Sequence, residues 1–204
     1  MEKPPSRIQQ RNRAAILSAG LDVFSQYGFR GSTLDQIADN AGLSKPNMLY
    51  YFKSKEAIHT ALLEDLLETW LDPLDAIDPT GDPVSEILGY VHRKLTLSRD
   101  YPRESRLFAN EILQGAPMLG SVLGSDLKAA VDAKARVIQG WVDAGRIAAV
   151  DPHHLIISVW ALTQHYADFD VQVRAVMAGR DTYAEAADHL EQMFRRMLEP
   201  LSKT

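Results

Sequence analysis

The side chains best suited to contacting a polyanion gather between Thr33 and Lys55. A short helical pattern beginning at Ser44 exposes hydroxyl, amine and amide groups, which can bond to phosphate oxygens and to base edges. The surface positions of this stretch are Ser44, Lys45, Pro46, Asn47, Tyr50 and Tyr51. Lys45 could pair with guanine and Asn47 with adenine in a major groove. The spacing predicts a helix that binds double-stranded DNA.

Two short helices joined by a tight turn would position these groups. Thr33 with Gln36 three residues later is typical of a capping box, and Gly42 separates this helix from a second one that Ser44 and Pro46 begin. The apolar positions of the pair are Leu34, Ile37, Ala38, Leu43, Met48, Leu49 and Phe52. The arrangement indicates a helix-turn-helix. The alternative is an ordinary helical corner with a polar surface.

Helical periodicity continues through the chain, and strand-like alternation is almost absent. The other helices are expected over about 8–27, 54–71, 83–99, 102–115, 125–143, at least 18 residues from 152, and 182–198, with Ser125 or Asp126 capping the fifth of these. Residues 75–83 form the clearest loop. The expected fold is all-α, with an N-terminal helix-turn-helix three-helix domain over residues 1–53 and a C-terminal helical domain over residues 54–204.

Composition and charge narrow the function further. The chain of 204 residues has no cysteine, which excludes disulfides, thiolate metal sites and a cysteine nucleophile. Residues 1–60 hold 8 Lys+Arg against 5 Asp+Glu, whereas residues 61–204 hold 14 against 22. A basic end on an acidic body indicates a polyanion partner at the N-terminus. With no leader pattern and no apolar run of membrane-spanning length, a cytoplasmic protein with no membrane contact is expected.

The N-terminal stretch resembles the TetR family of transcriptional regulators. The matching segments are Ala14-Ala-Ile-Leu, Phe24-Ser-Gln-Tyr-Gly-Phe, Thr33-Leu-Asp-Gln-Ile-Ala, Ala41-Gly-Leu-Ser and Tyr50-Tyr-Phe-Lys-Ser-Lys-Glu-Ala. The resemblance implies phosphate contacts from Thr33, Tyr50 and Lys55, base readout from residues 44–47, a homodimer, and a palindromic operator. Arg7, Arg11 and Arg13 precede or enter the first expected helix. Such a basic arm could reach the DNA backbone or minor groove, or be a disordered tail without fixed contacts.

A second resemblance covers most of the remaining chain, to the RutR group of pyrimidine-responsive regulators. It rests on Trp70-Leu-Asp-Pro-Leu, Ser98-Arg-Asp-Tyr-Pro-Arg-Glu-Ser-Arg-Leu-Phe, Leu113-Gln-Gly-Ala-Pro-Met-Leu, Asp151-Pro-His-His-Leu-Ile and Trp160-Ala-Leu-Thr-Gln-His-Tyr-Ala-Asp-Phe. The resemblance implies control of pyrimidine and nitrogen metabolism genes, with uracil or thymine as the small-molecule signal.

The side chains of the second half suit a flat polar ring. Trp160, Gln164 and Asp168 share one helix face, with an indole for stacking and an amide that can donate and accept. Trp70 could form a second wall, and Ser98 and Glu111 are further candidate contacts. The alternatives are that the tryptophans are core packing, that Gln164 and Asp168 are solvated, and that Glu111 pairs with a neighbouring arginine.

The C-terminal helices carry apolar stripes that are expected to form a dimer interface, although burial within the monomer is the alternative. The stripes consist of Leu155, Ile156, Val159, Leu162, Leu190, Met193, Phe194, Met197 and Leu198. No catalytic, metal-ligand or phosphate-loop motif is present, so neither an enzyme nor a cofactor is expected. The competing functions are a regulator that answers an unrelated metabolite and a helical protein-binding adaptor.

Overall fold

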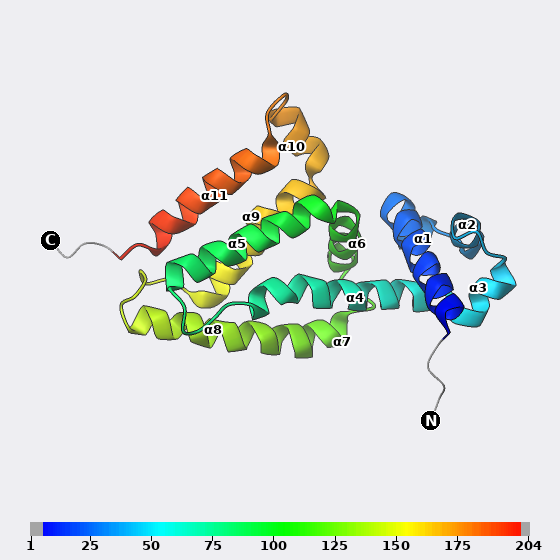
Figure 1. Cartoon of the computed structure of the whole chain (residues 1–204), viewed down its shortest axis with the longest axis horizontal. Coiled ribbons are helices and arrows are strands. Elements are labelled where there is room, and N and C mark those ends of the chain that lie inside the picture. Colours follow the sequence, from blue (N-terminus) through cyan, green and yellow to red (C-terminus); the bar gives the residue numbers. More distant parts are fainter. Residues whose placement is uncertain (1–5, 201–204) are drawn as a thin grey trace. The chain divides into compact units, whose positions relative to one another are not determined.

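The computed structural model describes residues 6–200, and within them every regular element is helical (Figure 1). The elements are α1 (Arg7–Gly31), α2 (Leu34–Asn40), α3 (Lys45–Tyr51), α4 (Lys55–Asp75), α5 (Pro83–Asp100), α6 (Pro102–Leu113), α7 (Gly120–Val122), the π-helix η1 (Leu123–Leu127), α8 (Lys128–Asp143), α9 (Pro152–Asp168), α10 (Asp170–Val176) and α11 (Thr182–Leu198). The all-α prediction is confirmed. Among the described helices, none has the length and apolar character required to span a membrane.

The described residues form two compact units. Unit 1 comprises the residues up to Leu67 together with Arg106–Leu119, and unit 2 comprises Glu68–Ser105 together with the residues from Gly120 onward. Helix α4 contributes its first part to unit 1 and its last part to unit 2. The predicted boundary between residues 53 and 54 stays a prediction.

Unit 1 holds α1 against the first part of α4 through a close backbone approach. A Cβ atom added at Gly20 of α1 would lie 2.8 Å from Ile58 Cγ2 of α4. Ile16, Phe24 and Ile58 are fully buried around this approach. A side chain at position 20 would therefore clash with Ile58 unless one of the two shifts.

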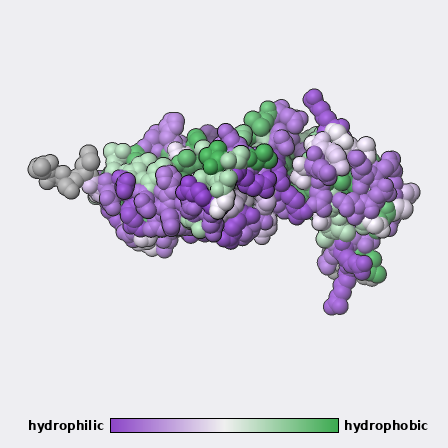
Figure 2. Space-filling model, turned by 90° about the horizontal axis from the view of Figure 1, so that it is seen from above, coloured by the Kyte–Doolittle hydropathy of each residue, from purple (hydrophilic) through white to green (hydrophobic). Residues whose placement is uncertain are grey.

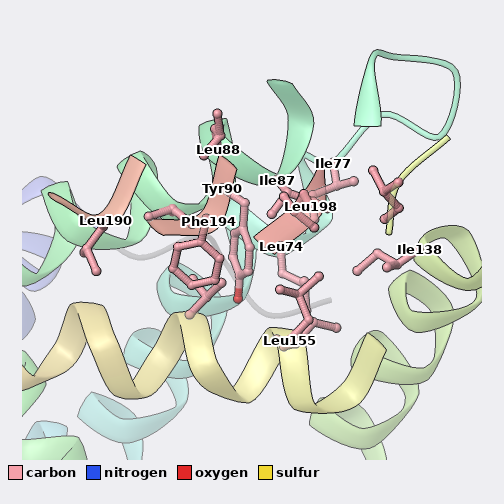
Figure 3. Close-up of a cluster of buried hydrophobic side chains, with 14 of the residues drawn as sticks. Leu74, Ile77, Ile87, Leu88, Tyr90, Ile138, Leu155, Leu190, Phe194 and Leu198 are labelled. Atoms are coloured by element: carbon pink, nitrogen blue, oxygen red, sulfur yellow. The ribbon is translucent and has the colours of Figure 1, made fainter. Parts of the chain in front are cut away.

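The core of unit 2 forms where α5 packs between α9 and α11. Figure 3 shows Tyr90 among buried side chains, with its hydroxyl directed toward α9. The labelled cluster contains Leu74, Ile77, Ile87, Leu88, Tyr90, Ile138, Leu155, Leu190, Phe194 and Leu198. These side chains come from five helices and the loop after α4, so one apolar core fixes the whole unit.

Several helix boundaries differ from the sequence prediction, among them the end of α1 at Gly31 instead of near residue 27. Helix α4 continues past Pro73, since Leu74 and Ile77 beyond it are buried in the core, and their burial offsets a disfavoured proline. Neither Ser125 nor Asp126 caps a helix, because η1 runs into α8 without a break. Helix α9 has 17 residues and ends at Asp168, and the short α10 follows directly after Phe169.

The predicted dimer stripes are wrong for most of their residues. Leu155, Ile156, Val159, Leu190, Phe194 and Leu198 are buried in the core of unit 2. The alternative of burial within the monomer therefore holds for them. Leu162 and Met197 remain exposed, as does Ile157, which the prediction did not include. On the face drawn in Figure 2, hydrophobic residues form separate groups within a largely hydrophilic surface.

Candidate functional site

The helix-turn-helix of unit 1 is built by local capping. The Thr33 side chain accepts from the Gln36 backbone N–H at 3.2 Å, and the Gln36 side chain accepts from the Thr33 N–H at 2.8 Å, so the predicted capping box is confirmed. Gly42 has a φ of 65°, which suits glycine in the turn. Ser44 then begins α3 by accepting from the Asn47 N–H at 3.4 Å.

Helix α3 divides into an apolar and a polar face as predicted. Met48 and Phe52 are buried, whereas Tyr50 is 63% exposed. The four residues at the start of the motif are all exposed, namely Ser44, Lys45, Pro46 and Asn47. The exposed donors of Ser44, Lys45 and Asn47 at a helix N-terminus fit base readout in a major groove.

Two of these polar groups already have partners within unit 1. Lys45 Nζ lies 3.0 Å from a carboxylate oxygen of Asp35 on α2, and both side chains are largely exposed. The Tyr51 hydroxyl accepts from Asn12 Nδ2 of α1 at 3.0 Å. Tyr51 is half-buried and packs edge-on against Tyr50. Lys45 must therefore leave Asp35 to contact a base.

Lys55 has a role within the fold that the sequence did not predict. Its ammonium donates to the backbone carbonyls of Phe29 at 2.7 Å and Ser32 at 2.8 Å, and it lies 4.4 Å from the Phe29 ring centre. These contacts connect the start of α4 to the end of α1. A phosphate contact by Lys55 stays a prediction and would add to these bonds.

The three arginines of the expected basic arm all lie within the first helix. Arg7, Arg11 and Arg13 all fall inside α1, which begins at a capping box formed by Ser6 and Gln9. Arg13 also stacks over the Phe52 ring at 4.8 Å. The alternative of a tail without fixed structure therefore does not hold for these three residues, and their contact with DNA stays a prediction. Residues 1–5 lie outside the described part of the chain.

Unit 2 contains a buried polar cluster that includes two predicted ligand residues, Trp70 and Asp168. Trp70 is buried, and its indole Nε1 has no hydrogen-bond partner among the described residues. The Nζ atom of Lys94 on α5 lies 5.2 Å from the centre of the Trp70 ring. Asp168 Oδ1 accepts from the Ser105 hydroxyl at 2.5 Å. We call Trp70, Lys94, Ser105 and Asp168 the polar cluster.

Charge and burial act on Lys94 in opposite directions. Burial lowers the pKa of the Lys94 ammonium to about 7, and the carboxylate of Asp168 opposes part of that decrease. An amine that titrates near neutral pH inside a protein is more typical of a functional site than of a surface. The sequence analysis missed Lys94, although its position among buried Tyr90, Val91 and Leu95 on α5 carried the signal.

The other predicted ligand residues differ in how the fold uses them. Trp160 donates from Nε1 to the Tyr90 hydroxyl at 2.6 Å, and Gln164 is half-buried on the same helix. The Ser98 hydroxyl donates to the Lys94 backbone carbonyl at 3.1 Å. Ligand contacts by these side chains stay predictions. For Ser98, a ligand contact through the hydroxyl would compete with its bond to Lys94, whereas stacking on the Trp160 ring would leave the Trp160 bond to Tyr90 intact.

Glu111 belongs to unit 1, whereas the other predicted ligand residues belong to unit 2. Its carboxylate is buried and accepts from the backbone N–H groups of Met118 at 2.6 Å and Leu119 at 3.3 Å. The partners of Glu111 are therefore backbone N–H groups. The described contacts of its carboxylate include no arginine, which was the alternative partner. Its ligand contact stays a prediction.

Two known protein families match the chain, one over its N-terminal part and one over the remainder. Residues 16–62 match the family described as "Bacterial regulatory proteins, tetR family". Residues 63–201 match the family described as "YcdC-like protein, C-terminal region", which spans more than half of the chain. The chain belongs to the TetR family. It is a DNA-binding transcriptional regulator with a C-terminal helical domain, and its helix-turn-helix is the DNA-binding element of this family.

Individual TetR-family proteins extend the match. The HTH-type transcriptional regulator RutR of Escherichia coli (strain K12) is 53% identical over 171 residues, which cover 84% of this chain and 81% of RutR. A bacterial regulatory protein in the tetR family from Rhodococcus RHA1 has a TM-score of 0.75 at 18% identity, covering 97% of this chain and 100% of that chain. AibR in complex with isovaleryl coenzyme A and operator DNA has a TM-score of 0.71 at 19% identity, covering 93% and 100%. The two solved structures show the fold.

Proposed function

We propose that this regulator binds a pyrimidine base, uracil or thymine, and that the base changes its affinity for an operator that controls pyrimidine and nitrogen metabolism genes. The proposal rests first on the similarity to RutR, which covers 84% of the chain. It supposes that this chain responds to the kind of ligand that the resemblance implies. The observation that carries it is the polar cluster of unit 2, where the buried Trp70 Nε1–H has no partner. An unsatisfied buried donor costs about 1–3 kcal/mol, and a ligand acceptor would recover that free energy.

A 2,4-dioxopyrimidine matches the groups near the cluster. Such a ring offers carbonyl acceptors and N–H donors in its plane, and its faces stack on aromatic side chains. Gln164 can donate to a carbonyl and accept from the adjacent N–H, and the Asp168 carboxylate can accept a further N–H. The indole of Trp70 or Trp160 can cover a face of the ring. Gln164 and Asp168 lie one turn apart on α9, so both can meet one ligand.

The response to ligand is proposed to pass along α4. This helix contains Trp70 near its C-terminal end and begins at Lys55, which bonds to the end of α1. Ligand that binds one orientation of α4 more tightly would shift the population toward it and alter DNA affinity. Trp70→Ala should weaken both ligand binding and ligand-induced DNA release. Unchanged values for both would contradict this route.

The proposal includes a homodimer on a palindromic operator. A two-fold dimer places two recognition helices at half-sites about 34 Å apart. Exposed apolar side chains on α9 and α11, namely Ile157, Leu162 and Met197, are available for such an interface. Analytical ultracentrifugation of the whole chain should show a dimer, and a monomer at micromolar concentration would contradict this part.

Calorimetric titration of the whole chain with uracil, thymine and cytosine tests the ligand. We expect saturable binding of uracil or thymine near one molecule per protomer. Gln164→Ala should weaken it by about tenfold to a hundredfold, as expected for the loss of two hydrogen bonds. Gln139→Ala is the matched control, since Gln139 is exposed on α8 and donates only to Asp143 in the described contacts. Absence of binding by all three bases would reject the pyrimidine proposal and leave the DNA-binding function in place.

A further inference from the structure

A lysine occupies a position in unit 2 where an apolar residue is expected. Lys94 is 1% exposed and lies on the face of α5 that carries the buried residues Tyr90, Val91, Leu95 and Ser98. Lysine is almost never fully buried unless its charge is paired, because leaving water is costly for an ammonium. A fold that retains lysine here uses its amine for a purpose other than packing.

An aromatic ring and a carboxylate surround the Lys94 amine, and both favour its charged form. Lys94 Nζ lies 5.2 Å from the centre of the Trp70 ring, within cation–π range. Asp168 on α9 is the negative charge that acts on the ammonium. The Asp168 carboxylate is itself held by the Ser105 hydroxyl, which is fully buried. The amine is therefore held in place from α4 and α9.

Donors outnumber acceptors at the Lys94 end of the cluster. The ammonium brings three N–H groups, and the Trp70 indole adds one more that has no partner in the described chain. A ligand that completes these bonds must present acceptors, such as carbonyl oxygens. A ring with an amino group in place of this carbonyl would bring another donor toward the ammonium. The ammonium, the Trp70 indole and the amino group would then all lack an acceptor.

We propose that Lys94 is the specificity-determining residue of the ligand site, and that its ammonium donates to a ring carbonyl of the bound base together with the Trp70 indole. The inference rests on the proposed pyrimidine function. It assigns the discrimination between an oxo group and an amino group, and so between uracil and cytosine, to one side chain. Gln164 and Asp168 would then orient the ring through its N–H groups.

Binding of the base is coupled to protonation of Lys94. The pKa of Lys94 is about 7 in the free protein, so part of the population is neutral near that pH. A carbonyl acceptor stabilises the charged form, and ligand binding therefore takes up protons. The affinity for uracil falls as the pH rises above the free pKa. Of the charged groups on the helices that pack against α5, Asp168 acts on Lys94, whereas Glu191 of α11 pairs with His92 at 3.1 Å.

Lys94→Met tests the assignment, because methionine is unbranched and only one atom shorter than lysine but carries no charge. Uracil affinity should fall by about tenfold to a hundredfold, as for the loss of a charge-assisted hydrogen bond. Cytosine affinity should stay unchanged or rise, so that the preference between the two bases collapses. Lys128→Met is the matched control, since Lys128 is exposed on α8 and pairs with Asp132. Its preference should equal that of the unaltered chain.

Proton uptake provides a second readout that needs no variant. Titration of the unaltered chain with uracil at about pH 7, in buffers with different heats of ionisation, should show net uptake of protons. If Lys94→Met does not fold, the measured proton uptake alone tests the role of Lys94. Uracil binding without proton uptake, or with the preference over cytosine intact in Lys94→Met, would overturn the role of Lys94 alone. Absence of pyrimidine binding by the unaltered chain would overturn the proposed function and this inference with it.

Discussion

The indole Nε1 of Trp160 donates to the hydroxyl oxygen of Tyr90 at 2.6 Å, which joins α9 to α5 inside the core of unit 2. Burial raises the pKa of the Tyr90 hydroxyl far above its usual value, so the acceptor of this bond is the oxygen of a neutral hydroxyl. Trp70 differs, because its buried N–H has no partner in the described chain. The indole N–H of Trp160 is therefore used inside the fold, whereas that of Trp70 has no partner in the described chain.

Phenylalanine substitutions separate the roles of the two indole N–H groups. Trp160→Phe removes the donor to the buried Tyr90 hydroxyl and should lower the free energy of unfolding by about 1–3 kcal/mol. Trp70→Phe removes a donor without a partner, so its effect on unfolding should be smaller, while uracil affinity should fall. Urea denaturation and calorimetric titration of both variants measure the two effects. Equal losses of stability, with equal ligand affinities, would contradict the division.

The ion pair between Lys45 and Asp35 should restrain DNA binding. Asp35→Asn releases Lys45 and removes a negative charge beside the recognition helix, so operator affinity should rise several-fold. Lys45→Ala should lower operator affinity by about 1–3 kcal/mol if the amine reads a base. Fluorescence anisotropy with labelled operator DNA over a range of salt concentrations measures both. A uniform loss across DNA sequences in Lys45→Ala would indicate a phosphate contact instead.

Gly20 should be intolerant of a side chain. A Cβ atom at this position would lie 2.8 Å from Ile58 Cγ2, so Gly20→Ala should destabilise unit 1 by about 1–3 kcal/mol through overpacking. Gly31→Ala is the control, because its Cβ would meet Tyr27 at an ordinary 3.5 Å. Chemical denaturation of the two variants compares them. The prediction fails if Gly20→Ala is as stable as Gly31→Ala.

His59 should make the stability of unit 1 depend on pH. Its ring is buried and packs edge-on against Phe24 with ring centres 5.0 Å apart, and burial lowers its pKa while the charge of Glu111 opposes that shift. In the pH range below the unfolded value of about 6.5, the unfolded state binds more protons, so stability falls as the pH decreases.

A pair of histidine variants checks this linkage. His59→Leu should lose the part of the pH dependence that lies below about pH 6.5. His154→Leu should retain it, because His154 is exposed on α9. Unfolding free energies are to be measured from about pH 5 to about pH 7.5. A wild-type pH dependence that survives unchanged in His59→Leu would assign it to other groups.

Local chemistry made much of the fold predictable. The N-caps at Thr33, Ser44, Asp82, Asp151 and Asp181 each involve a side chain and a backbone N–H within three residues, so the sequence alone indicates them. Long-range packing set the remaining features. The continuation of α4 past Pro73 and the end of α9 at Asp168 depend on neighbouring helices, which no short motif reports.

The candidate sites show the same division. The exposed face of α3 follows from helical periodicity, because buried Met48 and Phe52 fix its orientation. The dimer stripes were mistaken for a surface since periodicity identifies an apolar face without showing what covers it. The apolar neighbours of Lys94 on α5 indicated its burial, but only the fold brings it beside Trp70, which lies 24 positions earlier in the sequence.

Selection of random double-stranded DNA by the whole chain, with and without uracil, tests the central claim most directly. We expect enrichment of a site with two-fold symmetry whose half-sites are about one helical turn apart or a multiple of it. Uracil should change the affinity for that site in unaltered protein but much less in Gln164→Ala. Enrichment of an asymmetric site, or an operator affinity that is the same at every uracil concentration, would contradict a dimeric regulator that responds to a pyrimidine.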